Sequence, residues 1–363
     1  MAASVFFLLV AVSFSLSLAL TLLMHLVSPR LGLVDHPGER KIHRVTMPTG
    51  GGVAIMIATW LPVWAGVLAC MVWKGAGLAP ALWAEFGSHA SGVVALAPRL
   101  GIIFAGAAII WLIGLADDVW DLPAWPRFLV QVGVALMLYF SGLNVSIFIP
   151  DPWVSGAITV LWIVGLVNSF NMLDNMDGLS AGVACIIGAT LALVAYQTGH
   201  LFVTAFLCCV VGAVAGFLVF NFPPATIFMG DCGGTLIGYL LAVMTVEFTF
   251  YQPERPYFPI ALPLIMFAVP LFDTITVVWI RLRAGRSPWR GDTNHFSHRL
   301  VALGMSQRQA VLTIYLITAT VELGAGVLYY SSSAAILVIL AQTVALFAII
   351  GILENARPEK ARR

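Results

Sequence analysis

The stretch GAITVLWIVGLVNSFNMLDNMDGLSAGVACIIGATLALVAY, residues 156–196, places a polar segment between two apolar runs. Residues 156–167 and 183–196 contain no charged side chain, whereas residues 168–177 hold three asparagines and two aspartates. Only a helix or a closed barrel satisfies its own backbone hydrogen bonds inside a bilayer. We therefore expect two membrane helices with a cluster of oxygen ligands at their junction.

The composition of the whole chain agrees with a membrane protein. Over 363 residues, 60% are hydrophobic and 10% are charged, and the mean hydropathy is +0.97. Soluble domains carry about 25% charged residues, so we predict an all-α polytopic membrane protein. The net charge of +1 indicates no acidic partner, and we expect no nucleic acid partner. The five cysteines lack a pairing or metal-binding spacing and are expected to be small buried hydrophobic residues.

Eleven apolar runs approach the roughly 20 residues needed to cross about 30 Å of hydrocarbon. The fifth is short, and Gly238 interrupts the eighth. We predict one membrane domain over residues 1–353, followed by a basic tail at 354–363. The first run lacks a basic leader and is expected to stay in the protein as a span. The predicted spans are 5–27, 53–72, 100–116, 125–143, 155–167, 179–196, 201–220, 235–250, 258–280, 309–329 and 334–353.

The basic residues predict the orientation. Fifteen of the 18 Lys and Arg residues lie in one set of alternate connections and adjoining span ends, together with the C-terminal tail. The other set holds only Lys74, Arg99 and Arg255. By the positive-inside rule, the first set faces the cytoplasm. The N-terminus is then outside and the C-terminus is cytoplasmic.

All polar, motif-like segments fall in the cytoplasmic set. Besides residues 168–182 they are DHPGERKIHRVTMPTGGG (35–52), GLADDVWDL (114–122), FNFPPATIFMGDCGG (220–234) and RGDTNHFSHRL (290–300). One face of the membrane domain therefore gathers many carboxylates and histidines among arginines. Such a cluster suits a divalent cation and phosphorylated substrates.

The segment that follows residue 167 has a regular spacing of polar residues that is improbable by chance. Asn168, Asn171, Asp174 and Asp177 recur every three residues, and the row drifts about 60° per step on a helix. A helix end at Gly178 is expected to re-aim the last acid.

The other motifs also have purely structural explanations. Asp117 and Asp118 also suit a solvated helix end before Pro123, and Gly50–Gly52 suit a hinge. The segment around Asp231 also suits an ordinary Gly and Pro turn, and the two histidines of 290–300 suit interface charge. If the eighth span begins at Thr235, its N-terminal amides are available to a phosphate.

Taken together, the motifs resemble those of the polyprenyl-phosphate N-acetylhexosamine-1-phosphate transferases. The resemblance covers residues 35–300 in the family's order. The departures are Ser297 in place of a histidine, Asn175 where glycine is common, and Thr46 where proline is common. The matching positions are Arg40, Lys41, His43, Pro48, Gly51 and Gly52; Asp117, Asp118 and Asp121; Asn168, Asn171, Asp174 and Asp177; Asn221, Pro224, Ala225, Phe228, Met229, Gly230, Asp231 and Gly233; and His295, His298 and Leu300.

The resemblance implies an enzyme that transfers a sugar 1-phosphate from a UDP-sugar to undecaprenyl or another polyprenyl phosphate and releases UMP. It implies Mg²⁺ or Mn²⁺ held by Asp231 and Asp118, and Asp117 keeping the lipid phosphate deprotonated. It further implies that Asp174 and Asp177 complete the metal and nucleotide site. The implied substrate contacts are Asn221 to the nucleotide, Phe228 to uracil, Asn168 and Asn171 to substrate, and Lys41, His43, His295, His298 and Arg299 to diphosphate or sugar.

Within the family, the R-K-x-H and H-x-x-H elements look more like the UDP-GlcNAc type than the phospho-MurNAc-pentapeptide translocase. The resemblance also implies a bacterial inner membrane location with the active site facing the cytoplasm. It implies a role in initiating cell-surface polysaccharide synthesis and allows a homodimer.

A transporter or lipid flippase is the alternative from another class. Such a protein also has many spans and intramembrane acids such as Asp273 and Glu322. Asp273 is expected to pair with Arg281 or with a neighbouring span. The chain shows no internal repeat, which transporters often contain. A CDP-alcohol phosphotransferase is not favoured, because its D-G-x-x-A-R signature is absent.

Overall fold

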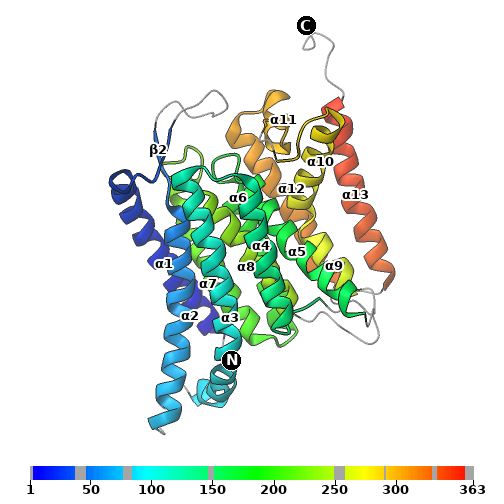
Figure 1. The fold of residues 1–363 in the computed structure, drawn as a ribbon. Coiled ribbons are helices and arrows are strands. Elements are labelled where there is room, and N and C mark those ends of the chain that lie inside the picture. The colour runs from blue at the N-terminus through cyan, green and yellow to red at the C-terminus, as the bar shows by residue number, and fades with distance from the viewer. Residues whose placement is uncertain are drawn as a thin grey trace.

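The structure is a computed structural model that describes residues 3–36, 46–76, 84–145, 151–248, 258–289, 292–328 and 333–355. Lys41, His43 and the last eight residues of the predicted tail lie outside these ranges. The described part is a helical bundle with one two-stranded sheet (Figure 1). The helices are α1 (Ala3–Val27), η1 (Ser28–Leu31), α2 (Gly51–Ala76), α3 (Ala84–Trp120), α4 (Ala124–Phe140), α5 (Pro152–Leu173), α6 (Leu179–Gln197), α7 (Leu201–Asn221), α8 (Asp231–Glu247), α9 (Phe258–Met266), α10 (Ala268–Arg283), α11 (Phe296–Ala302), α12 (Gln307–Leu328) and α13 (Ser333–Asn355).

The all-α polytopic prediction is confirmed, and within the described residues helices cover most of each predicted span. Within the described ranges, eight helices are long and apolar enough to cross a membrane, and α4 is a shorter apolar helix. The count of eleven spans stays a prediction. All five cysteines are free, and four of them are buried.

Several predicted boundaries are wrong. The fifth span is longer than expected, because Asp151 accepts hydrogen bonds from the amides of Trp153 and Val154 and so caps α5. Helix α5 then runs on through Asn168 and Asn171 and ends at Leu173, not at Gly178. Gly178 instead has a left-handed conformation at the start of α6.

The eighth and ninth predicted spans also differ from the structure. The eighth helix begins at Asp231 rather than Thr235, and it continues through Gly238, where a Cβ would lie 2.6 Å from the carbonyl oxygen of Leu166. The ninth span is two helices, α9 and α10, that meet at Phe267. Pro270 has no N–H to donate to the preceding turn, which accounts for a break at this place.

Close packing of small residues joins the helices. A Cβ on Gly212 or Gly216 of α7 would lie 2.4 Å from a backbone oxygen of α1, and Ser17 of α1 donates to the carbonyl oxygen of Ala213. This small-xxx-small arrangement lets two membrane helices approach closely. Helix α8 is buried along nearly its whole length, packed by α2, α3 and α5. The central helix therefore begins with Asp231.

The helices place the motifs at one end of the bundle. Strands β1 (Val34–Asp35) and β2 (Met47–Pro48) pair antiparallel at that end, and α11 lies at the same end (Figure 1). The N-terminal end of α1 lies at the other end (Figure 1). The parity of the spans therefore correctly grouped segments that are far apart in the sequence.

Candidate active site

The turn between α5 and α6 is fastened to the loop between α7 and α8. The Asn221 side chain accepts a hydrogen bond from the amide of Gly178 (3.0 Å) and donates to the carbonyl oxygen of Ile227 (2.9 Å). Asp177 accepts from the amide of Ala225 at 2.9 Å. Asn221 is only 2% exposed, so its amide groups are used within the protein. The side chains of Asn221 and Asp177 thus hold the two motif segments together.

The glycines before α2 pack against the same loop. The amides of Gly51 and Gly52 donate to the carbonyl oxygens of Phe228 and Met229, at 3.1 and 2.9 Å. A Cβ on Gly52 would lie 2.4 Å from the backbone nitrogen of Gly233. Close approach of the two backbones therefore explains why glycine is present at positions 51 and 52, without a hinge.

Asp118 caps the N-terminus of α8. Its two oxygens accept from the amides of Asp231 (2.6 Å) and Cys232 (3.2 Å). These amides are therefore engaged, contrary to the expectation that the start of the eighth span is available to a phosphate. Gly230 has φ +77°, and a Cβ there would lie 2.5 Å from Asp118 Oδ2. Both the backbone conformation and the available space require glycine at this position.

Arg127 of α4 connects the two aspartate motifs. Its Nη1 donates to Asp117 Oδ2 and to Asp231 Oδ2, the latter at 2.5 Å. The other oxygen of Asp117 accepts from the amide of Leu122 at 2.7 Å. From the sequence alone, Arg127 was only one of the fifteen basic residues that predict the orientation. A single guanidinium in the first turn of an apolar helix next to the D-D-x-x-D motif was the available indication of this role.

Four carboxylates share a small region. Burial, followed by the nearby carboxylates of Asp231, Asp118 and Asp177, raises the pKa of Asp174 to about 8. Such mutual repulsion is relieved by a cation. Asn171 contributes Oδ1, which is buried and has no hydrogen-bond partner among the described residues.

These oxygens suit a hard divalent cation. In the described ranges, no three His, Cys, Asp or Glu side chains converge as a complete metal site. Mg²⁺ usually binds one or two carboxylates and completes its shell with water and substrate phosphates. The residues present therefore fit Mg²⁺ or Mn²⁺ bound together with a phosphorylated substrate.

The histidine segment is organised by a buried aspartate. Asp273 of α10 accepts from the Phe296 amide (2.6 Å) and lies 2.8 Å from His295 Nδ1. Arg281 donates instead to both oxygens of Asp292, at 3.1 and 3.2 Å. Both expected partners of Asp273, Arg281 and a neighbouring span, are therefore wrong, because its partner His295 lies in the polar segment before α11. Burial opposes ionisation of Asp292, but the hydrogen bonds from Arg281 and Asn294 lower its pKa overall.

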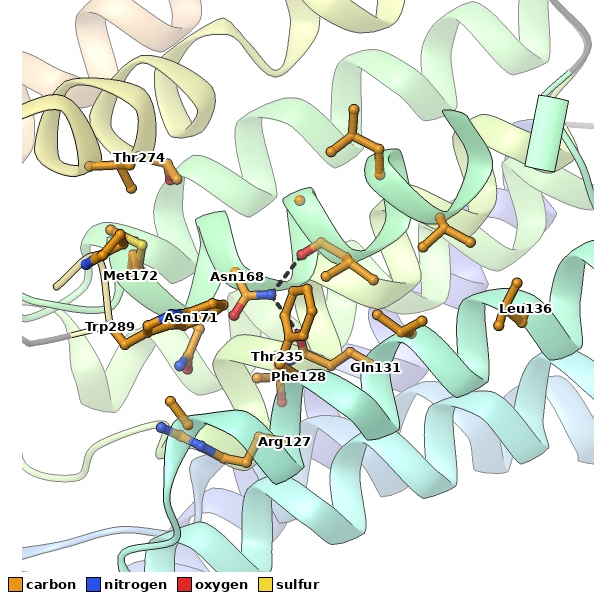
Figure 2. A pocket seen from close by; sticks show the side chains of 18 of the residues that line it. Arg127, Phe128, Gln131, Leu136, Asn168, Asn171, Met172, Thr235, Thr274 and Trp289 are labelled. Atoms are coloured by element: carbon orange, nitrogen blue, oxygen red, sulfur yellow. Dashed lines mark hydrogen bonds between the residues drawn. The ribbon is translucent and has the colours of Figure 1, made fainter. Parts of the chain in front are cut away.

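A cavity of about 1130 Å³ extends from Asp174 and Arg127 into an apolar groove, whereas Asp117, Asp118 and Asp231 do not line it. Its polar part includes Arg127, Asn168, Asn171, Asp174 and His295. In Figure 2, Asn171 lies beside Asn168, and Arg127 lies farther down in the view. Asn168 donates to Gln131 Oε1 and to the carbonyl oxygen of Val164. The rest of the cavity is lined mostly by apolar side chains of α4 and α5, among them Val132, Leu136, Phe140, Trp153, Val160 and Leu161.

The remaining predicted residues border this region in different ways. His298 is half-buried, with its ring centroid 6.0 Å from that of His295, and Arg299 donates to Thr276 Oγ1 at 3.3 Å. Phe228 is half-buried and its backbone pairs with Thr49, but Phe228 does not line the cavity. Asp121 is exposed at the end of the D-D-x-x-D motif. The positions of Asp117, Asp118, Asp174 and Asp231 bring the acids together as the motifs predict.

Comparisons with known proteins agree with these motifs. The model of glycosyl transferase family 4 matches residues 100–249, which include both the D-D-x-x-D motif and Asp231. The "Probable undecaprenyl-phosphate N-acetylglucosaminyl 1-phosphate transferase" of Bacillus subtilis is 34% identical over 83% of this chain and 78% of its own length. The "Decaprenyl-phosphate N-acetylglucosaminephosphotransferase" of Mycolicibacterium smegmatis is 33% identical over 82% of this chain and 75% of its own.

A third relative is more distant. The "Undecaprenyl-phosphate alpha-N-acetylglucosaminyl 1-phosphate transferase" of Escherichia coli K12 is 28% identical over 81% of this chain and 76% of its own. The chain belongs to glycosyl transferase family 4, among the polyprenyl-phosphate N-acetylhexosamine-1-phosphate transferases.

Proposed function

We propose that this protein transfers N-acetylglucosamine 1-phosphate from UDP-N-acetylglucosamine to a polyprenyl phosphate. An oxygen of the lipid phosphate forms a bond to the β-phosphorus, and the bond from that phosphorus to the bridging oxygen breaks. The products are polyprenyl-diphospho-N-acetylglucosamine and UMP, which keeps the bridging oxygen. The relatives' names describe the same type of transfer.

The observation that supports this proposal most strongly is the single cavity with a polar and an apolar part. Along α5, the lining changes from Asp174 and Asn171 to Leu161 and Trp153, which spans about 30 Å at 1.5 Å per residue. A ligand with a phosphate head and a long hydrocarbon tail matches such a lining. A small polar solute would leave the apolar part unused.

The charges of the polar part support a nucleotide diphosphate with a cation. A divalent ion held by Asp231, with Asp118, Asn171 and Asp174 nearby, would neutralise the diphosphate and favour departure of UMP. Arg127 and His295 also line the polar part of the cavity and carry nitrogen donors. Much of the expected catalysis is therefore positioning and charge neutralisation, as is usual for phosphoryl transfer.

The hydrogen bonds refine the role proposed for Asp117. Both of its oxygens accept, from Arg127 and from the Leu122 amide. A phosphate monoester with a second pKa near about 6 is already mostly dianionic at neutral pH. We therefore assign Asp117 to positioning Arg127 rather than to removing a proton from the lipid phosphate.

Asp177 and Asn221 are assigned to holding the loops, because their side chains bind backbone groups of Ala225, Gly178 and Ile227. His298 and Arg299 remain candidates for contacts to diphosphate or sugar. Phe228 remains a candidate for a contact to uracil, and Lys41 and His43 for contacts to diphosphate.

The proposed location is the bacterial plasma membrane with the site facing the cytoplasm. The positive-inside distribution of Lys and Arg supports this orientation. A nucleotide sugar made in the cytoplasm then reaches the site directly, and the product can enter synthesis of a cell-surface polysaccharide.

Purified protein in detergent, supplied with Mg²⁺, polyprenyl phosphate and a panel of UDP-sugars, tests the proposal. We expect UMP only when both substrates are present, fastest with UDP-N-acetylglucosamine, and none after chelation until Mg²⁺ or Mn²⁺ is restored. UMP release without lipid phosphate would contradict a transferase, and faster transfer from UDP-MurNAc-pentapeptide would contradict the sugar. Net movement of lipid across vesicles without UMP would favour a flippase.

A further inference from the structure

Two residues far apart in the sequence join the acidic turn to the histidine helix. Ser297 Oγ of α11 donates to Asn175 Oδ1 at 2.5 Å, across a separation of 122 positions. Asn175 Nδ2 in turn donates to the carbonyl oxygen of Met172 at 2.7 Å. Ser297 is 1% exposed, so little water is available to replace this bond. Asn175 directly follows Asp174 and also lines the cavity.

These two residues are also the departures from the family pattern nearest the site. Asn175 stands where glycine is common, and Ser297 stands where the middle histidine of the loop is common. In the fold the two departures touch each other. The side chain on the turn and the side chain on α11 therefore share one buried contact, so a change of size at one of them acts directly on the other.

The contact continues to His298. Ser297 Oγ lies 3.2 Å from His298 Nδ1. Because the hydroxyl hydrogen is given to Asn175, the serine oxygen is left to accept a hydrogen from Nδ1. In the neutral ring, Nε2 is then the nitrogen without a proton. Burial, followed by the neighbouring His295, lowers the pKa of His298, which favours this neutral ring near pH 7.

We propose that Asn175 and Ser297 are a matched pair of positioning residues that hold α11 against the acidic turn and fix the ring orientation and tautomer of His298. The chain His298 Nδ1–Ser297 Oγ–Asn175 Oδ1 supplies the geometry. The catalytic part of this inference rests on the proposed function, since His298 is taken to face the diphosphate or sugar. The pairing itself does not depend on the reaction.

Space at the contact gives the pairing a specific consequence. Replacing Ser297 alone by histidine puts an imidazole into a fully buried position against the Asn175 side chain. Overpacking of this kind forces side chains or backbone to shift. Replacing Asn175 by glycine at the same time removes the obstructing side chain.

The test compares wild type with Asn175→Gly, Ser297→Ala, Asn175→Gly/Ser297→Ala, Ser297→His and Asn175→Gly/Ser297→His. Ser306→Ala is the matched control, because it removes an exposed hydroxyl just after the same short helix. For each protein, kcat and KM for UDP-N-acetylglucosamine and the thermal unfolding midpoint in detergent are measured. The pH profile of kcat/KM is recorded for wild type and Ser297→Ala.

We expect Asn175→Gly and Ser297→Ala each to lower kcat about tenfold, and their combination to cost about tenfold rather than a hundredfold. Ser297→His should lower kcat about a hundredfold, and addition of Asn175→Gly should restore it to within about threefold of wild type. Ser297→Ala should also change the pH profile, which a purely structural loss of folded enzyme would not do. Ser306→Ala should keep the wild-type kcat, KM and pH profile and lower only the unfolding midpoint slightly, because its hydroxyl accepts the Gln309 amide at the start of α12.

The pairing would be overturned if the losses of kcat in Asn175→Gly and Ser297→Ala multiplied to about a hundredfold in the double variant. A Ser297→His variant as active as wild type would also overturn it. A wild-type protein that releases no UMP would instead reject the proposed function. In that case the thermal unfolding midpoints test the pairing. A midpoint of Asn175→Gly/Ser297→His above that of Ser297→His supports it. Additive shifts of the midpoint in Asn175→Gly/Ser297→Ala overturn it.

Discussion

Asp273 Oδ2 lies 2.8 Å from His295 Nδ1, and both side chains are buried. The second oxygen of Asp273 holds the amide of Phe296, so one carboxylate fixes both the imidazole and the start of α11. An aspartate on one membrane helix thereby sets the orientation of a histidine that lines the cavity of the proposed transferase. Neutral Asn at position 273 can provide a similar shape but not the two acceptor oxygens.

Asp273→Asn is therefore expected to lower kcat by about a hundredfold, with a smaller change in KM, because the histidine loses its orientation. His295→Ala and the double variant should show nearly the same loss, since the two residues act as a unit. Steady-state kinetics of the three variants checks this prediction. A double variant much slower than either single variant would show that Asp273 acts independently of His295.

Asp231→Asn should reduce transfer by at least about a thousandfold while the protein remains folded, because a proposed cation ligand loses its charge. Glu247→Gln is the matched control at the opposite end of α8, where Glu247 pairs with Arg99 at 2.7 Å. UMP release and thermal unfolding are measured for both variants. Full turnover by Asp231→Asn would contradict its proposed role.

Gly230→Ala should abolish activity, because the new methyl group would meet the Asp118 carboxylate at 2.5 Å in a backbone with φ +77°. Gly199→Ala has almost the same φ, +79°, but a Cβ there meets no atom within 4 Å. The control should lose only about 1 kcal/mol of stability, from strain alone. The thermal unfolding midpoint and UMP release of the two variants distinguish backbone strain from a steric clash with Asp118. Equal activity in the two variants would show that the close approach of Asp118 to Gly230 is unimportant.

Leu161→Trp should raise KM for a long-chain polyprenyl phosphate several-fold, because Leu161 lines the apolar groove. Leu323→Trp is a suitable control, since Leu161 is 74% exposed and Leu323 73%, and Leu323 does not line the cavity. A short-chain acceptor phosphate should be less affected by the substitution at Leu161. Equal kinetic effects of the two substitutions on the long-chain acceptor would argue against the groove as the lipid site.

The sequence predicted those features that depend on run length and on order along the chain. Apolar runs located the helices, and span parity grouped Asp117, Asp174, Asp231 and His295 at one end. The break at Phe267 and the extension of α5 to Leu173 escaped prediction, because local caps and proline positions decide them.

Side-chain partners were harder to predict because they depend on how packed helices are rotated against each other. Arg127 reaches two aspartates from motifs 114 positions apart, and Asp118 caps a helix more than 100 positions away. Asp273 selects His295 rather than the nearer Arg281 for the same reason. No pattern within a single segment contains this information.

The central claim is that the motif segments form one site on the cytoplasmic side, and labelling of single cysteines near 114–122, 220–234 and 290–300 tests it most directly. In a cysteine-free background, Asp121→Cys, Thr226→Cys and Ser306→Cys each place a thiol at an exposed position near one motif region, and Gln197→Cys places one at the other end of α6. We predict that a membrane-impermeant maleimide labels the first three only in inside-out vesicles and Gln197→Cys only in right-side-out vesicles. Labelling of Asp121→Cys and Thr226→Cys from opposite sides of the membrane would contradict the account.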